Sequence, residues 1–179
     1  MLADALREFY LYGDEALRRL LTAAGRVTPE QWVMPSAGGQ PSLRDTVVHV
    51  VSSQRSWLAS WEGILTPVEA MAWNLDPAEY PDAASLVAEA GDVHDRTMRF
   101  LAGHDDASLH RLLVVELPDG GRWASRFRWM LLHVANHGTQ HRSKAAWMLT
   151  QYGQSPGEID LIYHFDRLGE AALAASSKA

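Results

Sequence analysis

Hydrophobic residues recur at three- and four-residue steps along most of the chain, the spacing that places side chains on one face of an α-helix. The pattern covers residues 2–24, 42–64, 82–101 and 125–152, and a shorter copy covers 157–173. It predicts an all-α protein built as a four-helix bundle with a short extra C-terminal helix. No linker or repeat interrupts the pattern, so we expect one domain over 1–179, with a frayed tail after about residue 173.

Polar residues mark where several of these helices begin and end. Ser42 can cap the second helix and Asp82 the third, because their side-chain oxygens can accept hydrogen bonds from the exposed amides of a first turn. Thr28-Pro29-Glu30-Gln31 has the pattern of a capping box at a short helical turn. Gly153 is a typical stop for the last long helix.

The connections are less regular. Residues 66–81 contain three prolines and predict an ordered loop. Residues 112–116 favour a β-strand, and the Asp119-Gly120-Gly121 turn that follows permits a small hairpin before the last long helix. That helix is expected to begin at Ser125.

Composition changes the picture in three ways. The formal net charge of −6 argues against electrostatic binding to nucleic acid. The chain has no cysteine, which excludes disulfides and thiolate ligands or nucleophiles and fits a reducing cytoplasm. The first residues lack the apolar core of a signal peptide, and no apolar run is long enough to cross a membrane. We therefore expect a cytoplasmic protein with no nucleic-acid or membrane partner.

Histidines supply the candidate chemistry. His133, His137 and His141 follow one another at four-residue steps, so they share one face of the last long helix. Trp129 and Ala145 extend this stripe, which predicts that it faces the apolar interior. Neutral imidazoles one turn apart can share a divalent metal ion, and a third ligand must then come from another helix.

His49, one turn inside the second helix, is the candidate for that third ligand. On its own it would be interpreted as a buried core histidine. Because His137 and His141 need a third ligand, we interpret it as a metal ligand. Three protein ligands leave a position for water or substrate, the arrangement of a catalytic site. His133 is expected near the ligands as a supporting or core residue rather than a fourth ligand. Arg142 is a candidate to bind an anionic substrate or cofactor, with a surface role as the alternative.

The sequence resembles the DinB/YfiT-like superfamily of metal-binding four-helix bundles. Ser42-Leu43-Arg44-Asp45 before His49, the segment from His133 to His137, and His141-Arg142 carry the resemblance, with Tyr152-Gly153-Gln154 near the end. It implies a bundle with a crossover connection, a homodimer, and a metal triad at His49, His137 and His141. Gly138 and Ser143-Lys144 depart from the family pattern, where an acidic residue and Gly-Gln are common.

The resemblance also implies a function. Characterised relatives are mostly thiol-dependent transferases, and others are described as metal-dependent hydrolases. We expect a metal-dependent enzyme with zinc or nickel that transfers a low-molecular-weight thiol, such as bacillithiol, to a small electrophilic substrate. A hydrolase that activates water at the metal is the first alternative, and a non-catalytic metal-binding or stress-response interaction protein is the second.

Overall fold

A computed structural model describes residues 2–117 and 119–176 of the chain. The four long helices of the predicted bundle are α1 (Leu2–Ala24), α3 (Leu43–Trp61), α5 (Ala83–Ala102) and α6 (Phe127–Gln151). Helices α1 and α3 each pack against both α5 and α6. Consequently α1 and α3 lie diagonally across the bundle from each other, as do α5 and α6.

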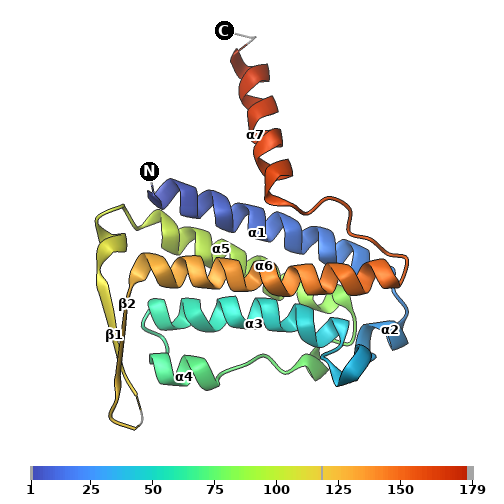
Figure 1. The fold of residues 1–179 in the computed structure, drawn as a ribbon, viewed down its shortest axis with the longest axis horizontal. Helices are drawn as coiled ribbons and strands as arrows, with labels where there is room; N and C mark the ends of the chain where they lie inside the picture. The colour runs from blue at the N-terminus through green and yellow to red at the C-terminus, as the bar shows by residue number, and fades with distance from the viewer. Residues whose placement is uncertain (1, 118, 177–179) are drawn as a thin grey trace.

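This arrangement requires a long connection between α3 and α5. The chain leaves α3 at one end of the bundle, passes through α4 (Pro67–Ala72), and returns along α3 to the other end through η2 (Pro77–Glu79), where α5 begins (Figure 1). Helices α3 and α5 therefore run in the same direction. The predicted all-α bundle with a crossover connection is confirmed.

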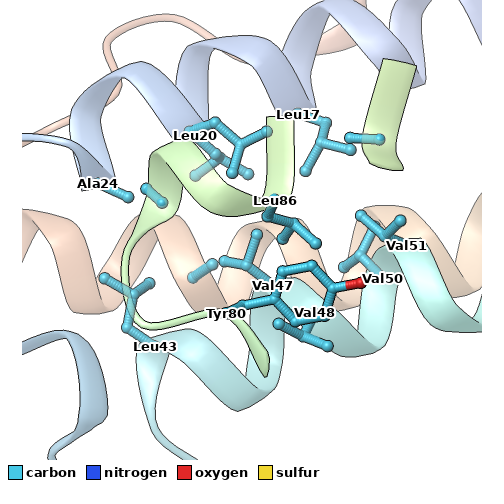
Figure 2. Packing of buried hydrophobic residues seen from close by; sticks show 14 of the residues in the cluster. Leu17, Leu20, Ala24, Leu43, Val47, Val48, Val50, Val51, Tyr80 and Leu86 are labelled. Carbon is cyan, nitrogen blue, oxygen red and sulfur yellow. The ribbon is translucent and has the colours of Figure 1, made fainter. Parts of the chain in front are cut away.

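The main core lies between α1, α3 and α5, where leucines and valines interdigitate (Figure 2). Four valines of α3, Val47, Val48, Val50 and Val51, are buried there. A valine costs up to about 0.7 kcal/mol of helix propensity relative to alanine. Full burial of its side chain returns about 1.5–3 kcal/mol, so packing outweighs propensity and α3 stays helical.

Several predicted boundaries are confirmed at the capping residues. The Ser42 hydroxyl accepts a hydrogen bond from the Asp45 amide at 3.0 Å, and the Asp82 side chain accepts one from the Ser85 amide at 2.8 Å. Thr28 and Gln31 form the predicted capping box of α2 (Pro29–Val33). A further 3₁₀ turn, η1 (Ala37–Gly39), lies between α2 and α3.

The segment 66–81 is more ordered than the predicted loop. Thr66 and Glu69 form a second capping box, with Pro67 in the first turn, and so start α4. This is the signal that identified α2, but the short length of the segment and its neighbouring prolines concealed it. Helix α3 ends at Trp61 rather than near residue 64, because Gly63 has a positive φ of 74° that turns the chain out of the helix.

The hairpin forms as predicted and corrects the start of α6. After η3 (Ser108–His110), β1 (Leu112–Glu116) pairs antiparallel with β2 (Arg122–Arg126), in a register that joins Leu113 to Ser125. Ser125 thus belongs to the strand, and α6 begins two residues later. The Phe127 amide donates to the Arg111 carbonyl at 3.0 Å and closes the hairpin onto the helix.

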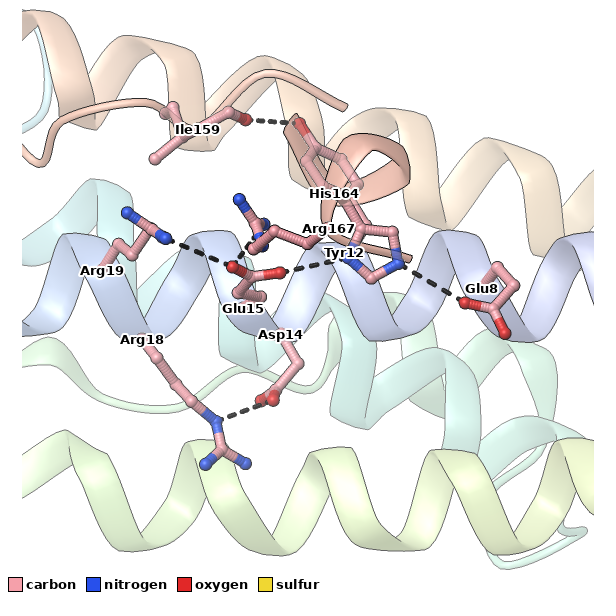
Figure 3. Close-up of polar contacts among 9 residues, drawn as sticks. All are labelled: Glu8, Tyr12, Asp14, Glu15, Arg18, Arg19, Ile159, His164 and Arg167. Atoms are coloured by element: carbon pink, nitrogen blue, oxygen red, sulfur yellow. Dashed lines mark hydrogen bonds and ion pairs between the residues drawn. The ribbon is translucent and has the colours of Figure 1, made fainter. Parts of the chain in front are cut away.

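The last helix, α7 (Leu161–Ser176), begins four residues later than predicted and projects away from the bundle (Figure 1). Gly157 has a positive φ of 76°, which delays the helix. Polar contacts hold its first turns on α1: both ring nitrogens of His164 face carboxylates, Nδ1 that of Glu15 and Nε2 that of Glu8 (Figure 3). Arg167 pairs with Glu15 as well. The predicted frayed tail lies partly outside the described residues.

Candidate metal centre

Three of the predicted site residues converge where α3 faces α6. One ligand atom from each of His49, His137 and His141 lies within 4.8 Å of the other two. Helix α3 supplies His49, and α6 supplies the other two from successive turns of one face. All three rings are partly buried. The structure thus assembles a group that can hold a metal ion from positions 88 residues apart in the sequence.

The spacing of the ring nitrogens fits a metal better than a hydrogen bond. The Nε2 atoms of His49 and His137 face each other at 3.3 Å. Two nitrogens bound to one tetrahedral zinc ion at about 2.1 Å would lie roughly 3.4 Å apart. A hydrogen bond across the same gap would be long, and it would leave the third imidazole of the cluster outside it.

The protonation state also suits a metal. Burial lowers the pKa of His49 below its usual value. Burial and repulsion from the neighbouring imidazoles lower the pKa of His137 to about 4. Burial, His49 and the nearby Lys144 lower the pKa of His141. All three rings are therefore neutral near pH 7, the form that ligates metal ions.

Ser53 supports one of the candidate ligands. Its Oγ lies 3.4 Å from Nδ1 of His137, whereas the other ring nitrogen, Nε2, faces His49. A hydroxyl that accepts the Nδ1 proton would fix the tautomer that presents Nε2 to a metal. Ser53 was not among the predicted site residues, although it lies four residues after His49 and therefore on the same face of α3.

His133 lies outside the three-histidine cluster. Its side chain is exposed, and its ring packs edge-on against Trp57 with 6.1 Å between ring centroids. Trp129, which we predicted to continue the stripe into the interior, is 52% exposed, whereas Ala145 is fully buried. The histidine stripe enters the core only at its C-terminal end, because each four-residue step advances about 40° further round a helix of 3.6 residues per turn, so the stripe winds from an exposed face into the core.

Arg142 points away from the histidines and is buried, which corrects the surface role predicted for it and separates it from the candidate metal centre. It is only 5% exposed and packs between α6 and α1, where its Nη2 donates to the Thr139 hydroxyl at 2.9 Å and its guanidinium lies over the Tyr12 ring. One step along a helix turns the side chain by about 100°, so the neighbour of a ligand faces another direction. Gly138 makes room for the guanidinium: a Cβ there would lie 2.7 Å from Nη1.

A cavity of about 200 Å³ opens beside His49, between α3 and the crossover connection. Trp57 and Trp73 contribute aromatic walls, and Ser53 links the cavity to the histidine cluster. The remaining lining residues are Ser56, Pro67, Ala70, Met71 and Asn74. No pattern in the sequence predicts this cavity, since more than half of its lining residues belong to segment 66–81, which was interpreted as a loop.

Comparisons with known proteins agree with this architecture. Protein DinB of Bacillus subtilis (strain 168) is 24% identical over 163 residues, which cover 89% of this chain and 92% of that protein. The solved structure of YfiT from Bacillus subtilis, described as a probable metal-dependent hydrolase with an unusual four-helix bundle topology, superimposes with a TM-score of 0.65. It is 20% identical and covers 84% of this chain and 89% of its own.

The family assignment rests on nearly the whole chain. Residues 1–168 match the DinB family, a range that includes the four bundle helices and all three clustered histidines. None of the helices within the described residues has the length and apolarity to cross a membrane. The chain therefore belongs to the DinB family.

Proposed function

We propose that the protein is a metal-dependent enzyme whose divalent ion, zinc or nickel, is held by His49, His137 and His141. The observation that carries the proposal is the convergence of three neutral imidazoles on one point, with a nitrogen–nitrogen distance of 3.3 Å between two of them. A divalent ion held there would act as a Lewis acid toward water, a thiol or a substrate carbonyl. No fourth acidic, histidine or cysteine ligand joins this cluster within the described residues, which suits an open coordination position.

Hydrolysis of a small ester or amide is the reaction we favour. It needs only water and the residues at hand: the histidines hold the ion, Ser53 orients His137, and the adjacent cavity holds the substrate. The similarity to YfiT, described as a probable metal-dependent hydrolase, supports this choice. Transfer of a low-molecular-weight thiol such as bacillithiol remains a second proposal from the family resemblance, and this cysteine-free chain would have to take that thiol from solution.

Metal content tests the proposal directly. Protein purified without a histidine tag should contain about one equivalent of metal, as expected for a three-ligand site. His141→Ala should lose the metal, because two imidazoles bind it far more weakly than three. His133→Ala is the matched control, since it removes an exposed histidine of the same helix that lies outside the cluster. A wild-type protein that stays metal-free after reconstitution would refute the proposal.

The cobalt(II) form separates the two reactions. A thiol that binds the ion produces a sulfur-to-cobalt charge-transfer band, which water or an ester does not. Bacillithiol that gives this band and is consumed with an electrophile would establish the transferase. Ester or amide cleavage without added thiol, lost in His141→Ala and kept in His133→Ala, would establish the hydrolase.

A further inference from the structure

The cavity beside His49 carries features that select a class of substrate. Apart from His49, whose pKa is lowered by burial so that its ring is neutral near pH 7, the lining contains no acidic or basic side chain. Its volume of about 200 Å³ lies below the roughly 300–1,000 Å³ typical of pockets for drug-sized ligands. We propose that this cavity binds the apolar, preferably flat, part of a small uncharged substrate and discriminates against charged analogues of the same shape. This inference rests on the proposed function, because it assigns the substrate side of the same centre.

The walls of the cavity favour a flat apolar group. The side chains of Trp57 and Trp73 are both partly buried and line the space together with Met71. Aromatic rings and thioethers bind flat apolar groups through large contact areas and polarizable surfaces. Ser56 and Asn74 add a hydroxyl and an amide that can both donate and accept hydrogen bonds. Such groups suit the carbonyl of an ester or an amide and cannot balance a full charge.

Two cations close to the site, Arg55 and Lys144, do not compensate a charged ligand. Arg55 lies over the Trp73 ring at 4.8 Å, and its guanidinium pairs with Glu89 at 2.5 Å. Because Glu89 already neutralises this cation, Arg55 offers little attraction to an anion and no partner to a cation. Lys144 lowers the pKa of His141 but does not line the cavity. Its ammonium donates a hydrogen bond to the side-chain oxygen of Gln40 at 3.4 Å. A charge moved from water into this space would lose hydration without gaining a partner.

Two anchors keep the cavity formed. The Leu75 amide donates to the buried Ser52 hydroxyl at 2.9 Å, which ties the crossover connection to α3 next to Trp73. The Thr66–Glu69 capping box fixes the start of α4 on the opposite side. The space is therefore part of the folded protein and does not depend on a bound metal.

The test uses three probes of nearly identical shape: benzamide is neutral, benzoate is an anion and benzamidinium is a cation. Binding is measured on protein treated with a chelator, so that benzoate cannot bind a metal ion. The readout is the indole N–H signals of Trp57 and Trp73 in NMR spectra, assigned with tryptophan-to-phenylalanine variants. We expect benzamide to bind about tenfold more tightly than either charged probe, a ratio that corresponds to about 1.4 kcal/mol.

A charge placed on the wall should narrow this selectivity. Met71 is 59% exposed, so Met71→Lys adds a cation at the rim with little effect on folding. It should raise benzoate affinity several-fold and lower benzamide affinity modestly, because the thioether of Met71 is lost. Val87→Lys is the matched control, because Val87 is a 54% exposed apolar residue of α5 outside this cavity. The control should leave all three affinities unchanged.

Three results would overturn the inference: benzoate or benzamidinium binding as tightly as benzamide, none of the probes shifting the two indole signals, or equal effects of Met71→Lys and Val87→Lys. Failure of the proposed function is separate from these results. A protein that binds benzamide but never holds metal would keep the cavity assignment and lose the enzyme, and a metalloprotein that ignores all three probes would do the reverse.

Discussion

Replacing Gly138 by alanine should change the stability of the protein through two opposing effects. Alanine in a helix interior is favoured over glycine by about 1 kcal/mol. However, the new Cβ would lie 2.7 Å from Nη1 of Arg142. A flexible surface arginine would simply move, but this one is only 5% exposed, and Gly13 of α1 lies against the other side of its guanidinium.

These contacts determine how much Gly138→Ala should change the stability. Overpacking a confined site costs about 1–3 kcal/mol, so Gly138→Ala should be destabilising by about 1 kcal/mol overall. Gly91→Ala is the matched control, because Gly91 also lies inside a long helix but a Cβ there would meet nothing within 4 Å. It should stabilise by about 1 kcal/mol. For a domain of this size each kcal/mol moves Tm by about 2–4 °C, so the two variants should shift Tm in opposite directions.

Thermal unfolding in the presence of a chelator measures both variants without a contribution from bound metal. In an Arg142→Met background the effect of Gly138→Ala should turn from a loss into a gain, because the guanidinium that the new methyl group meets is gone. The difference between the effects of Gly138→Ala in the two backgrounds is the coupling energy between the two sites. Equal Tm gains for Gly138→Ala and Gly91→Ala would refute the reasoning and show that the Arg142 side chain moves freely in its buried position.

Other predictions concern the histidines and α7. Because the pKa of His137 is lowered to about 4, zinc affinity should change little between pH 8 and about pH 6.5 and fall in more acidic solution; a tenfold fall between pH 7.5 and 6.5 would contradict this. Ser53→Ala should weaken metal binding by about tenfold, as loss of a ligand's outer hydrogen-bond partner typically does, and competition with a chromogenic chelator measures it. Burial opposes ionisation of Glu15, but hydrogen bonds from Arg167 and His164 outweigh it and lower its pKa, so the attachment of α7 should hold above about pH 4.5 and weaken as the carboxylate is protonated in acid. Hydrogen exchange across residues 161–176, corrected for intrinsic rates, should show this loss, and Glu15→Gln should show it already at pH 6.

The sequence predicted the bundle because its helices obey local rules. The capping hydroxyl of Ser42 and the regular apolar spacing on α1 act within a few residues, so they are visible without a structure. The same rules fixed which histidines share a face of α6. They did not show which faces of α6 are covered: Trp129 is 52% exposed although Met130 and Leu131 beside it are buried, and this depends on how the other helices pack around α6.

The residues around the candidate site were harder to predict for the same reason. The direction of Arg142 depends on space left by Gly13 and Gly138, which lie on different helices and meet only in the folded protein. The cavity beside His49 depends on where the crossover connection returns along α3. Its walls come from Trp73 and Met71, and no periodic pattern marks either residue in the sequence.

The separation of His49 from the other two candidate ligands has a consequence for how the chain matures. A ribosome adding about 5–20 residues per second needs about 4–18 s to proceed from His49 to His137, 88 residues later. During that time α3 has been made, but its long partner α6 has not, and the valines of α3 lack part of their final cover. No emerging fragment can present all three imidazoles, so the nascent chain cannot capture the ion early through the complete triad. An ion that binds only the completed bundle would stabilise the finished fold through mass action, and cellular metal supply would then influence how long each new copy survives.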